Sequence, residues 1–256
     1  MNKVLVALSG GLDSTTLLYY FVKKLGVDNV YAISMDYKQR HDIELYQAKK
    51  TCRRLGVKHH IVDMTWLYDI VSKTSSMVKN DIETPHDASE YMPSTYVPFR
   101  NLIISGILLS YAEAHNIDTV ALGIMHEGLQ DNATAVRYWD TTEEFAKAMQ
   151  HLVDLNNKHR IHYVAPFVNF TKKDEIELGL KLGVPYEETW TCYAGKIDMD
   201  EQIFETEPMG GRIIKYRRHY QPCGQCPSCI GRLDAFKKLG INDPLMTYGV
   251  WEEYFS

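Results

Sequence analysis

Four cysteines in the last quarter of the chain have the spacing of a metal site. Cys223, Cys226 and Cys229 read C-x-x-C-x-x-C, and Cys192 lies upstream of them. Clustered cysteines in a reducing compartment indicate a metal rather than disulfides. Four thiolates satisfy tetrahedral zinc and leave no open position for water, so we expect one structural zinc per chain; an iron–sulfur cluster or no metal are the alternatives. The fifth, Cys52, stands alone in a helical stretch and is expected to be a buried core residue.

A glycine-containing turn near the start of the chain has the character of a phosphate-binding loop. The string SGGLDST, residues 9–15, follows a short apolar run and opens a helical pattern. Glycines let the backbone approach an anion, and the amides of a helix N-terminus and nearby hydroxyls donate to it. No lysine follows as in a Walker A loop. The residues expected to hold the nucleotide phosphates are Ser9, Gly10, Gly11, Asp13, Ser14 and Thr15.

The loop string also indicates which nucleotide chemistry is at work. SGGLDS is the signature of a PP-loop, which holds the pyrophosphate that departs when a substrate oxygen attacks the α-phosphorus of ATP. Asp13, an acidic residue beside a bound triphosphate, is expected to position a hydrated Mg²⁺. Stabilisation of the helix N-terminus is its alternative role, and the two can coexist.

Apolar runs alternate with helical patterns along most of the chain. Short apolar runs at residues 4–8, 30–35, 57–62, 119–124 and 162–167 predict buried strands. Strands that alternate with helices predict an α/β fold, with right-handed crossovers and a parallel sheet covered on both faces. The intervening helices are expected at residues 12–25, 42–55, 101–115, 142–157 and 172–182.

The alternation stops near residue 190, which we take as the boundary between an ATP-binding domain (1–189) and a C-terminal zinc-binding region (190–256). An acidic stretch at 198–207 and a basic stretch at 212–218 flank Gly210-Gly211. This pattern is typical of a hairpin with arms that pair across, and equally of a solvated loop.

Composition excludes several classes of protein. The chain has 256 residues, 24% of them charged, and a formal net charge of -5. Proteins that bind nucleic acid by neutralising phosphates are usually basic, so a direct nucleic-acid partner is not expected. No apolar run approaches the ~20 residues that span a bilayer, and the first residues lack a signal-peptide pattern, so we expect a cytoplasmic protein.

Taken together, the motifs resemble a known family. The strings SGGLDSTT, DYKQRHDIE, YVPFRN, FTKKDEIELGLKLGVPYEETWTCYAG and CGQCPSCIGRLDAF occur in that order. They resemble the 7-cyano-7-deazaguanine synthases of queuosine biosynthesis, the QueC family, over nearly the whole chain. The resemblance implies a five-stranded parallel sheet of the PP-loop (adenine nucleotide alpha-hydrolase-like) type with a zinc knuckle, often as a homodimer.

The resemblance also implies an activity and further site residues. The reaction converts 7-carboxy-7-deazaguanine and ammonia to a nitrile with ATP, through an adenylated carboxylate and an amide. Lys172 would neutralise the leaving pyrophosphate, and Arg100 and Asn101 would face the nucleotide or the deazaguanine. Substrate contacts are also expected from Gln39 and Arg40, since they follow a strand end. His41 would assist proton transfer, or alternatively be a structural histidine.

Three features depart from the family pattern. The loop after the fourth strand usually reads DSGYPDC, whereas residues 126–141 read HEGLQDNATAVRYWDT. Phe99 stands where a glycine is usual, and the segment between Cys192 and Cys223 is longer than expected. Asp131 is the candidate in the altered loop to accept hydrogen bonds from a guanine-like N–H edge, with a solvated loop acid as the alternative.

Three other functions are alternatives to this one. A related ligase would stop at the amide or join the deazaguanine carboxylate to another amine. A tRNA-thiolating PP-loop enzyme would need a basic surface and free cysteines. A non-catalytic nucleotide-binding or zinc module would have no need of both the loop and Lys172.

Overall fold

The computed structural model describes residues 2–37, 43–71, 75, 95–125, 138–156, 158–206 and 212–255. Its main body is a five-stranded sheet in the order β3-β2-β1-β4-β5, with every neighbouring pair parallel. The predicted five-stranded α/β fold is therefore confirmed. The strands are β1 (Val4–Ala7), β2 (Val30–Asp36), β3 (Lys58–Asp63), β4 (Thr119–Ala121) and β5 (His162–Val164).

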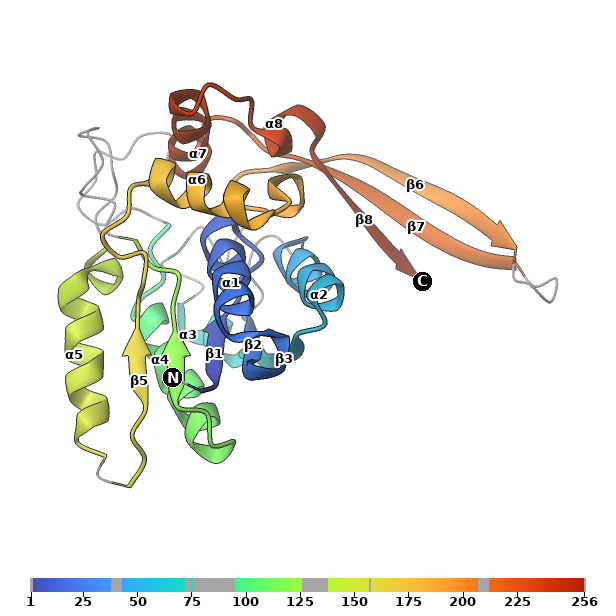
Figure 1. Ribbon diagram of the computed structural model, residues 1–256. Helices are drawn as coiled ribbons and strands as arrows, with labels where there is room; N and C mark the ends of the chain where they lie inside the picture. The colour runs from blue at the N-terminus through green and yellow to red at the C-terminus, as the bar shows by residue number, and fades with distance from the viewer. Residues whose placement is uncertain are drawn as a thin grey trace.

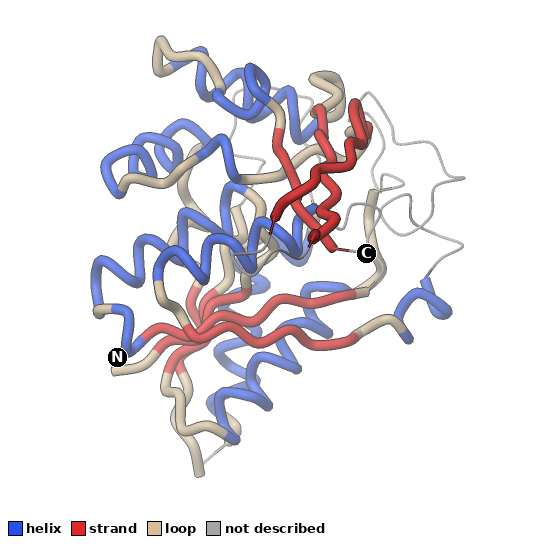
Figure 2. Tube along the Cα trace, turned by 90° about the vertical axis from the view of Figure 1, so that its right-hand side faces the viewer, coloured by secondary structure: helices blue, strands red, loops and turns tan. Residues whose placement is uncertain are grey.

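Helices cover both faces of this sheet (Figures 1 and 2). Helices α1 (Leu12–Leu25) and α2 (Ile43–Leu55) bury their apolar sides in one core, where Cys52 is 2% exposed, as predicted. A second core lies on the opposite face. It is formed by α3 (Trp66–Val71), α4 (Arg100–Ala114) and α5 (Glu143–Asp154).

The sequence signals at the helix ends explain the boundaries of α6 (Lys172–Leu182). The Thr171 side chain accepts from the Asp174 amide while the Asp174 carboxylate accepts from the Thr171 amide, which forms a capping box. Gly183 ends the helix with a positive φ. The 3-10 turns of the chain are η1 (Val27–Asn29), η3 (Trp139–Thr141) and η4 (Tyr186–Glu188).

The C-terminal region forms a hairpin and two helices. Strands β6 (Lys196–Thr206) and β7 (Arg212–Gln221) pair antiparallel. The predicted hairpin is therefore confirmed, and the alternative prediction of a solvated loop is wrong. The acidic and basic stretches do lie opposite each other, with Glu201 paired in register with Arg217. A third strand, β8 (Val250–Phe255), adds to β7, and the three-stranded sheet extends away from the main body (Figure 1). The two helices are α7 (Pro227–Lys238) and α8 (Pro244–Tyr248).

Helix α7 connects this region to the main body. Ala235 and Phe236 of α7 share a buried cluster with Ile176 of α6 and with Leu12, the first residue of α1. A fully buried ion pair fixes the other side of α7, where the Arg232 guanidinium donates to both carboxylate oxygens of Asp243 at 2.7 and 2.9 Å. Among the described residues, no helix has the length and apolar character that a membrane crossing requires.

Candidate functional site

The predicted phosphate loop lies between the carboxyl end of β1 and the N-terminus of α1. Gly10 has a φ of +87°, and a Cβ on this residue would lie 2.1 Å from the backbone oxygen of Glu44 in α2. Only glycine therefore lets the loop turn left-handed and pack against the α2 backbone. The Gly10 carbonyl accepts from the Trp190 amide at 3.0 Å, which ties the loop to the start of the C-terminal region.

Two serine hydroxyls brace the loop from within. Ser14 Oγ accepts from the Ser9 amide at 3.1 Å and lies 3.0 Å from Ser9 Oγ, which in turn accepts from the Gly11 amide at 3.3 Å. No side chain caps the N-terminus of α1, a helix of 14 residues. The first amides of such a helix are a favourable place for an anion.

A charged triad stands beside the loop. Lys172, the first residue of α6, donates to the Asp13 carboxylate and, at 3.2 Å, to the Glu175 carboxylate. Glu175 is completely buried, and burial together with the nearby Asp13 charge raises its pKa well above the ordinary value, although Lys172 opposes the shift. The sequence analysis missed Glu175, whose one signal is its position three residues after Lys172 on the same helix face.

A cavity of about 260 Å³ opens in front of the loop, where the carboxyl ends of the parallel strands meet. It brings together most of the predicted residues that the structure describes: Ser9, Gly11, Asp13, Ser14, Arg100 and Asn101 line it. Gly10, Thr15 and Lys172 are not among its lining residues. Gly10 is the loop residue that packs against α2, and Lys172 reaches Asp13 from α6. The Thr15 hydroxyl is buried and has no hydrogen-bond partner among the described residues.

The cavity wall formed by β2 and α4 carries charged side chains and phenols. Arg100 donates to the Tyr37 hydroxyl at 3.5 Å, and the side-chain amide of Asn101 donates to the backbone carbonyl of Asp140 at 3.2 Å. Burial would lower the pKa of Arg100, but Tyr37, Tyr193 and Asp140 more than offset it, so the guanidinium stays charged. Burial also raises the pKa of Asp140, against the charge of Arg100.

Glu44 is a second cavity residue that the sequence analysis missed. It lines the cavity from the first turn of α2, and burial raises its pKa to about 7, although the nearby Arg100 lowers it. Its signal was present, since it is the last residue of the string DYKQRHDIE.

Phe99, which departs from the family pattern, keeps the backbone geometry of a glycine. Its φ and ψ are 54° and 21°, in the left-handed region that bulky residues rarely adopt. Its side chain is 54% exposed, packs edge-on against Trp139 at 5.3 Å between ring centroids, and does not line the cavity. The Phe99 ring thus lies outside the cavity, and its backbone has a conformation that glycine adopts without strain.

Four predicted substrate or proton-transfer residues fall outside the described part of the chain. They are Gln39, Arg40, His41 and Asp131.

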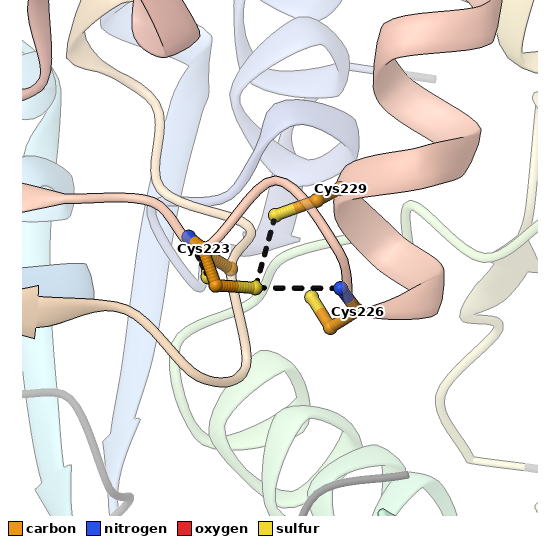
Figure 3. A group of neighbouring side chains, drawn as sticks. Cys223, Cys226 and Cys229 are labelled. Atoms are coloured by element: carbon orange, nitrogen blue, oxygen red, sulfur yellow. Dashed lines mark hydrogen bonds between the residues drawn. The ribbon is translucent and has the colours of Figure 1, made fainter. Parts of the chain in front are cut away.

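The four predicted cysteines come together as a possible metal centre. Their Sγ atoms all lie within 4.8 Å of one another, and those of Cys223 and Cys229 are 3.9 Å apart (Figure 3). Zinc–sulfur bonds of about 2.3 Å in a tetrahedron require sulfurs about 3.8 Å apart, so this donor set fits zinc. Cys192, Cys226 and Cys229 are buried and Cys223 is partly exposed.

Backbone amides of the knuckle point at the sulfurs. Cys223 Sγ accepts from the backbone amides of Gln225 and Cys226 at 3.4 and 3.3 Å. Gly224, whose backbone is left-handed, forms the turn between Cys223 and these amides. Hydrogen bonds from Cys192, Cys226 and Cys229 also hold the pKa of the Cys223 thiol below its ordinary value. These donors favour the thiolate of Cys223, the form that binds a metal, whereas hydrogen bonds within the cluster and burial raise the pKa of Cys192 and Cys229.

The cysteine cluster shares its surroundings with the cavity. Thr191 and Tyr193, on either side of Cys192, line the cavity, as does Ser228 between the last two cysteines. Residues adjacent to the cysteines thus form part of the cavity wall, whereas the cysteines themselves pack with Trp190 and other apolar residues.

This sheet order is that of a doubly wound α/β protein. The string SGGLDS, in the turn after the central strand, is the signature of the PP-loop type. A family model for "Queuosine biosynthesis protein QueC" matches residues 3–240. The chain therefore belongs to the QueC family, as its motifs predicted.

Curated relatives match along almost their full length. The chain is 38% identical to the 7-cyano-7-deazaguanine synthase of Trichodesmium erythraeum, with 95% of this chain and 100% of the relative covered. It is 33% identical to the enzyme of that name from Persephonella marina, with 95% and 96% covered. It is 34% identical to the 7-cyano-7-deazaguanine synthase of Archaeoglobus fulgidus, with 98% of this chain and 92% of the relative covered.

Proposed function

We propose that the protein is an ATP-dependent carbon–nitrogen ligase that converts 7-carboxy-7-deazaguanine and ammonia to 7-cyano-7-deazaguanine, in the queuosine or deazapurine pathway. The observation that carries the proposal is one cavity lined both by the PP-loop and by Arg100 and Asn101. This arrangement can hold a triphosphate next to a carboxylate, which is the juxtaposition that adenylation requires. The names of the relatives supply the substrate.

The first step is activation of an unreactive acid. A carboxylate is a poor acyl donor because its oxygen is a poor leaving group, so its attack on the α-phosphorus makes AMP the leaving group and releases pyrophosphate. Ser9, Gly10, Gly11, Ser14 and Thr15 would hold the phosphates through hydroxyls and amides, and Lys172 would neutralise the departing charge. Arg100 would attract the acid or the α-phosphate, with Asn101 beside it.

Asp13 fits a role beside Mg²⁺. Its carboxylate lines the cavity and is 34% exposed, and Mg²⁺ in nucleotide sites is held by one or two carboxylates together with the phosphates. Bound there, the ion would supply positive charge against the phosphate oxygens. Lys172, now paired with Asp13, would then be available to the pyrophosphate while Glu175 keeps it in place.

The later steps need two further bond changes at the same carbon. Ammonia attacks the acyl adenylate, and the amide forms as AMP leaves. The amide oxygen then attacks a second ATP, and loss of that oxygen with AMP gives the nitrile. Gln39, Arg40 and Asp131 are proposed to contact the deazaguanine, and His41 to assist proton transfer.

The cysteine cluster is proposed to hold one structural Zn²⁺ per chain. The separation of the four sulfurs and the amides directed at Cys223 support this assignment. The ion would contribute to folding, and through Thr191 and Tyr193 it would stabilise the cavity wall.

The remaining parts of the proposal come from the sequence. We propose a cytoplasmic homodimer with an ATP-binding domain at 1–189 and a zinc-binding region at 190–256. Its partners are the small-molecule acid and ammonia, with no direct nucleic-acid or membrane partner.

The decisive experiment is mass spectrometry of the products from 7-carboxy-7-deazaguanine, ATP and ammonium. The nitrile is expected, with AMP and pyrophosphate. Accumulation of the amide would favour the alternative ligase that stops there, which the altered loop at residues 126–141 makes worth testing. Formation of neither product would contradict the proposed function.

A further inference from the structure

Glu44 occupies a position in the cavity that the proposed steps leave unused. It lies in the first turn of α2, where its backbone oxygen contacts the phosphate-loop residue Gly10 and its side chain reaches the cavity. Arg100 faces it from α4, and Asp13 lines the same cavity from α1. Glu44 therefore lines the same cavity as the loop that is expected to hold the phosphates and as Arg100, which is expected to attract the acid.

The Glu44 carboxylate differs from two paired acids of the molecule. Glu44 is partly buried and within the described residues forms no hydrogen bond and no ion pair, whereas Glu175 is paired with Lys172 and Asp243 with Arg232. Buried acids usually have such partners, because an uncompensated carboxylate in a protein interior is costly. A carboxylate that faces a cavity without a partner is suited to a cationic ligand.

The proposed reaction supplies a cation that must lose a proton. Ammonia in neutral solution is almost entirely ammonium, which has no lone pair and cannot attack an acyl carbon. We propose that Glu44 binds this ammonium in the cavity and accepts its proton. This inference rests on the proposed function and names the residue that makes its nitrogen nucleophile.

One proton passes from ammonium to a Glu44 carboxylate oxygen and leaves neutral ammonia. The nitrogen lone pair then forms the C–N bond to the adenylated carbon, and the C–O bond to AMP breaks with its electron pair on the AMP oxygen. The nitrogen, now positive, loses a second proton to water as the amide forms, and Glu44 returns its own proton to water before the next turnover.

The environment of Glu44 suits a base that works near neutral pH. Burial raises its pKa to about 7 and Arg100 opposes the shift. Tyr37, at the end of β2, also faces it, and burial raises the pKa of this phenol so that it stays uncharged. A base is most effective when its pKa is close to the working pH.

The test separates activation of the acid from attack by nitrogen. In the Glu44→Gln variant, ATP–pyrophosphate exchange driven by 7-carboxy-7-deazaguanine should match the wild type, because adenylation needs no ammonia. Amide formation from ammonium at pH 7 should fall by about 100- to 10,000-fold. Hydroxylamine, which is mostly uncharged at pH 7, should still give the hydroxamate, and the deficit with ammonium should shrink as the pH rises. Glu143→Gln, an exposed glutamate of α5, is the matched control.

The outcomes distinguish this inference from the proposed function. Equal losses with ammonium and hydroxylamine, or lost exchange in a variant that keeps its Tm, would overturn the role of Glu44. Unchanged amide formation would do the same. Absence of exchange in the wild type would instead overturn the proposed function itself. If Glu44→Gln fails to fold, Glu44→Asp serves, and it should retain exchange with slower amide formation.

Discussion

The phosphate loop and the cysteine cluster border the same cavity but are held in opposite ways. The loop is fixed by the chain itself, through the left-handed Gly10, the serine hydroxyls and the packing of α1 and α2. The cluster brings four sulfurs within 4.8 Å of one another, and backbone amides donate to Cys192 and Cys223, but no disulfide joins these cysteines. Its geometry is that of a metal shell. We infer from this difference that the loop carries chemistry on a preformed support, and we propose that the cluster contributes stability and depends on a bound ion.

This contrast implies that substitutions on the two sides should have separable effects. A change at a loop side chain should affect turnover and leave stability nearly intact. A change at a cysteine should affect stability first and activity as a consequence, because Thr191 and Tyr193 beside Cys192 line the cavity.

Loss of one cysteine ligand should have the largest effect. We expect Cys226→Ser to lose the metal and to lower the free energy of unfolding by about 5 kcal/mol or more, since structural zinc supplies ~10–16 kcal/mol of apparent binding energy. Metal analysis and chemical denaturation measure this. Cys52→Ser, at a buried cysteine in the other core, is the control and should keep its full metal content. A Cys226→Ser protein that melts like the wild type would show that the cluster does not stabilise the fold.

Loss of the loop carboxylate should separate activity from stability. We expect Asp13→Ala to reduce turnover by about 100- to 1,000-fold, the usual loss for one charge-positioning group. The free energy of unfolding should change by only about 1 kcal/mol, because Asp13 is partly exposed and Lys172 keeps Glu175 as a partner. Turnover and Tm are measured together, with the exposed Asp28→Ala as control. Near-normal turnover would contradict a catalytic role of the loop.

The packing of the loop against α2 should be measurable with two glycines. Gly10 and Gly26 both have positive φ, at 87° and 78°, but a Cβ on Gly26 meets nothing within 4 Å. Gly26 also has a ψ of 150°, in a region open essentially to glycine alone, so Gly26→Ala should cost about 1–3 kcal/mol from backbone strain alone. Gly10→Ala should cost about 1–3 kcal/mol more because of the clash with Glu44. Equal costs in chemical denaturation would show that the loop is not held by this packing.

The smallest expected effect is a pH dependence of stability at His59, near the phosphate loop. The Ser34 hydroxyl donates to the Leu8 carbonyl at 2.6 Å, so it accepts from His59 Nε2, which lies 2.7 Å away. Burial, with Lys49 and His60 adding to it, lowers the pKa of His59 to about 4, against an ordinary value of 6.5. Between these values the unfolded chain binds the extra proton, so stability present above pH 6.5 is lost as the pH falls towards 4.

We expect His59 to contribute on the order of 1 kcal/mol per pH unit within this window. Denaturation of His59→Gln between pH 4 and 7 should show a shallower acid loss than the wild type, while His162→Gln, which keeps His59, should follow the wild type. Identical slopes in His59→Gln and the wild type would refute the assignment.

The sequence predicted local features well and long-range contacts poorly. The bounds of α1 and α6 were predicted to the residue, because Gly26, Gly183 and the Thr171 cap mark their ends locally. Strands β4 and β5 are shorter than the apolar runs that predicted them. The residues just past β4, such as Leu122 and Ile124, remain apolar because they line the cavity instead of continuing the strand.

The candidate site was predictable where a motif carries the chemistry. The loop and the cysteines are short patterns, and each of them is in place. Glu44, Glu175 and Tyr193 acquire their roles only when α2, α6 and the C-terminal region meet around the loop, and no local pattern records that contact. Strand β8 was also missed, since its pairing with β7 depends on the chain's return after α8.

The central claim is that the loop directs attack by a substrate oxygen on the α-phosphorus of ATP. The most direct measurement follows ¹⁸O from doubly labelled 7-carboxy-7-deazaguanine in a reaction with ATP and ammonium, with the nucleotides analysed by mass spectrometry. We predict that each AMP carries one ¹⁸O, that pyrophosphate carries none, and that the nitrile retains no oxygen. Label in inorganic phosphate together with ADP, or AMP without label, would contradict the account.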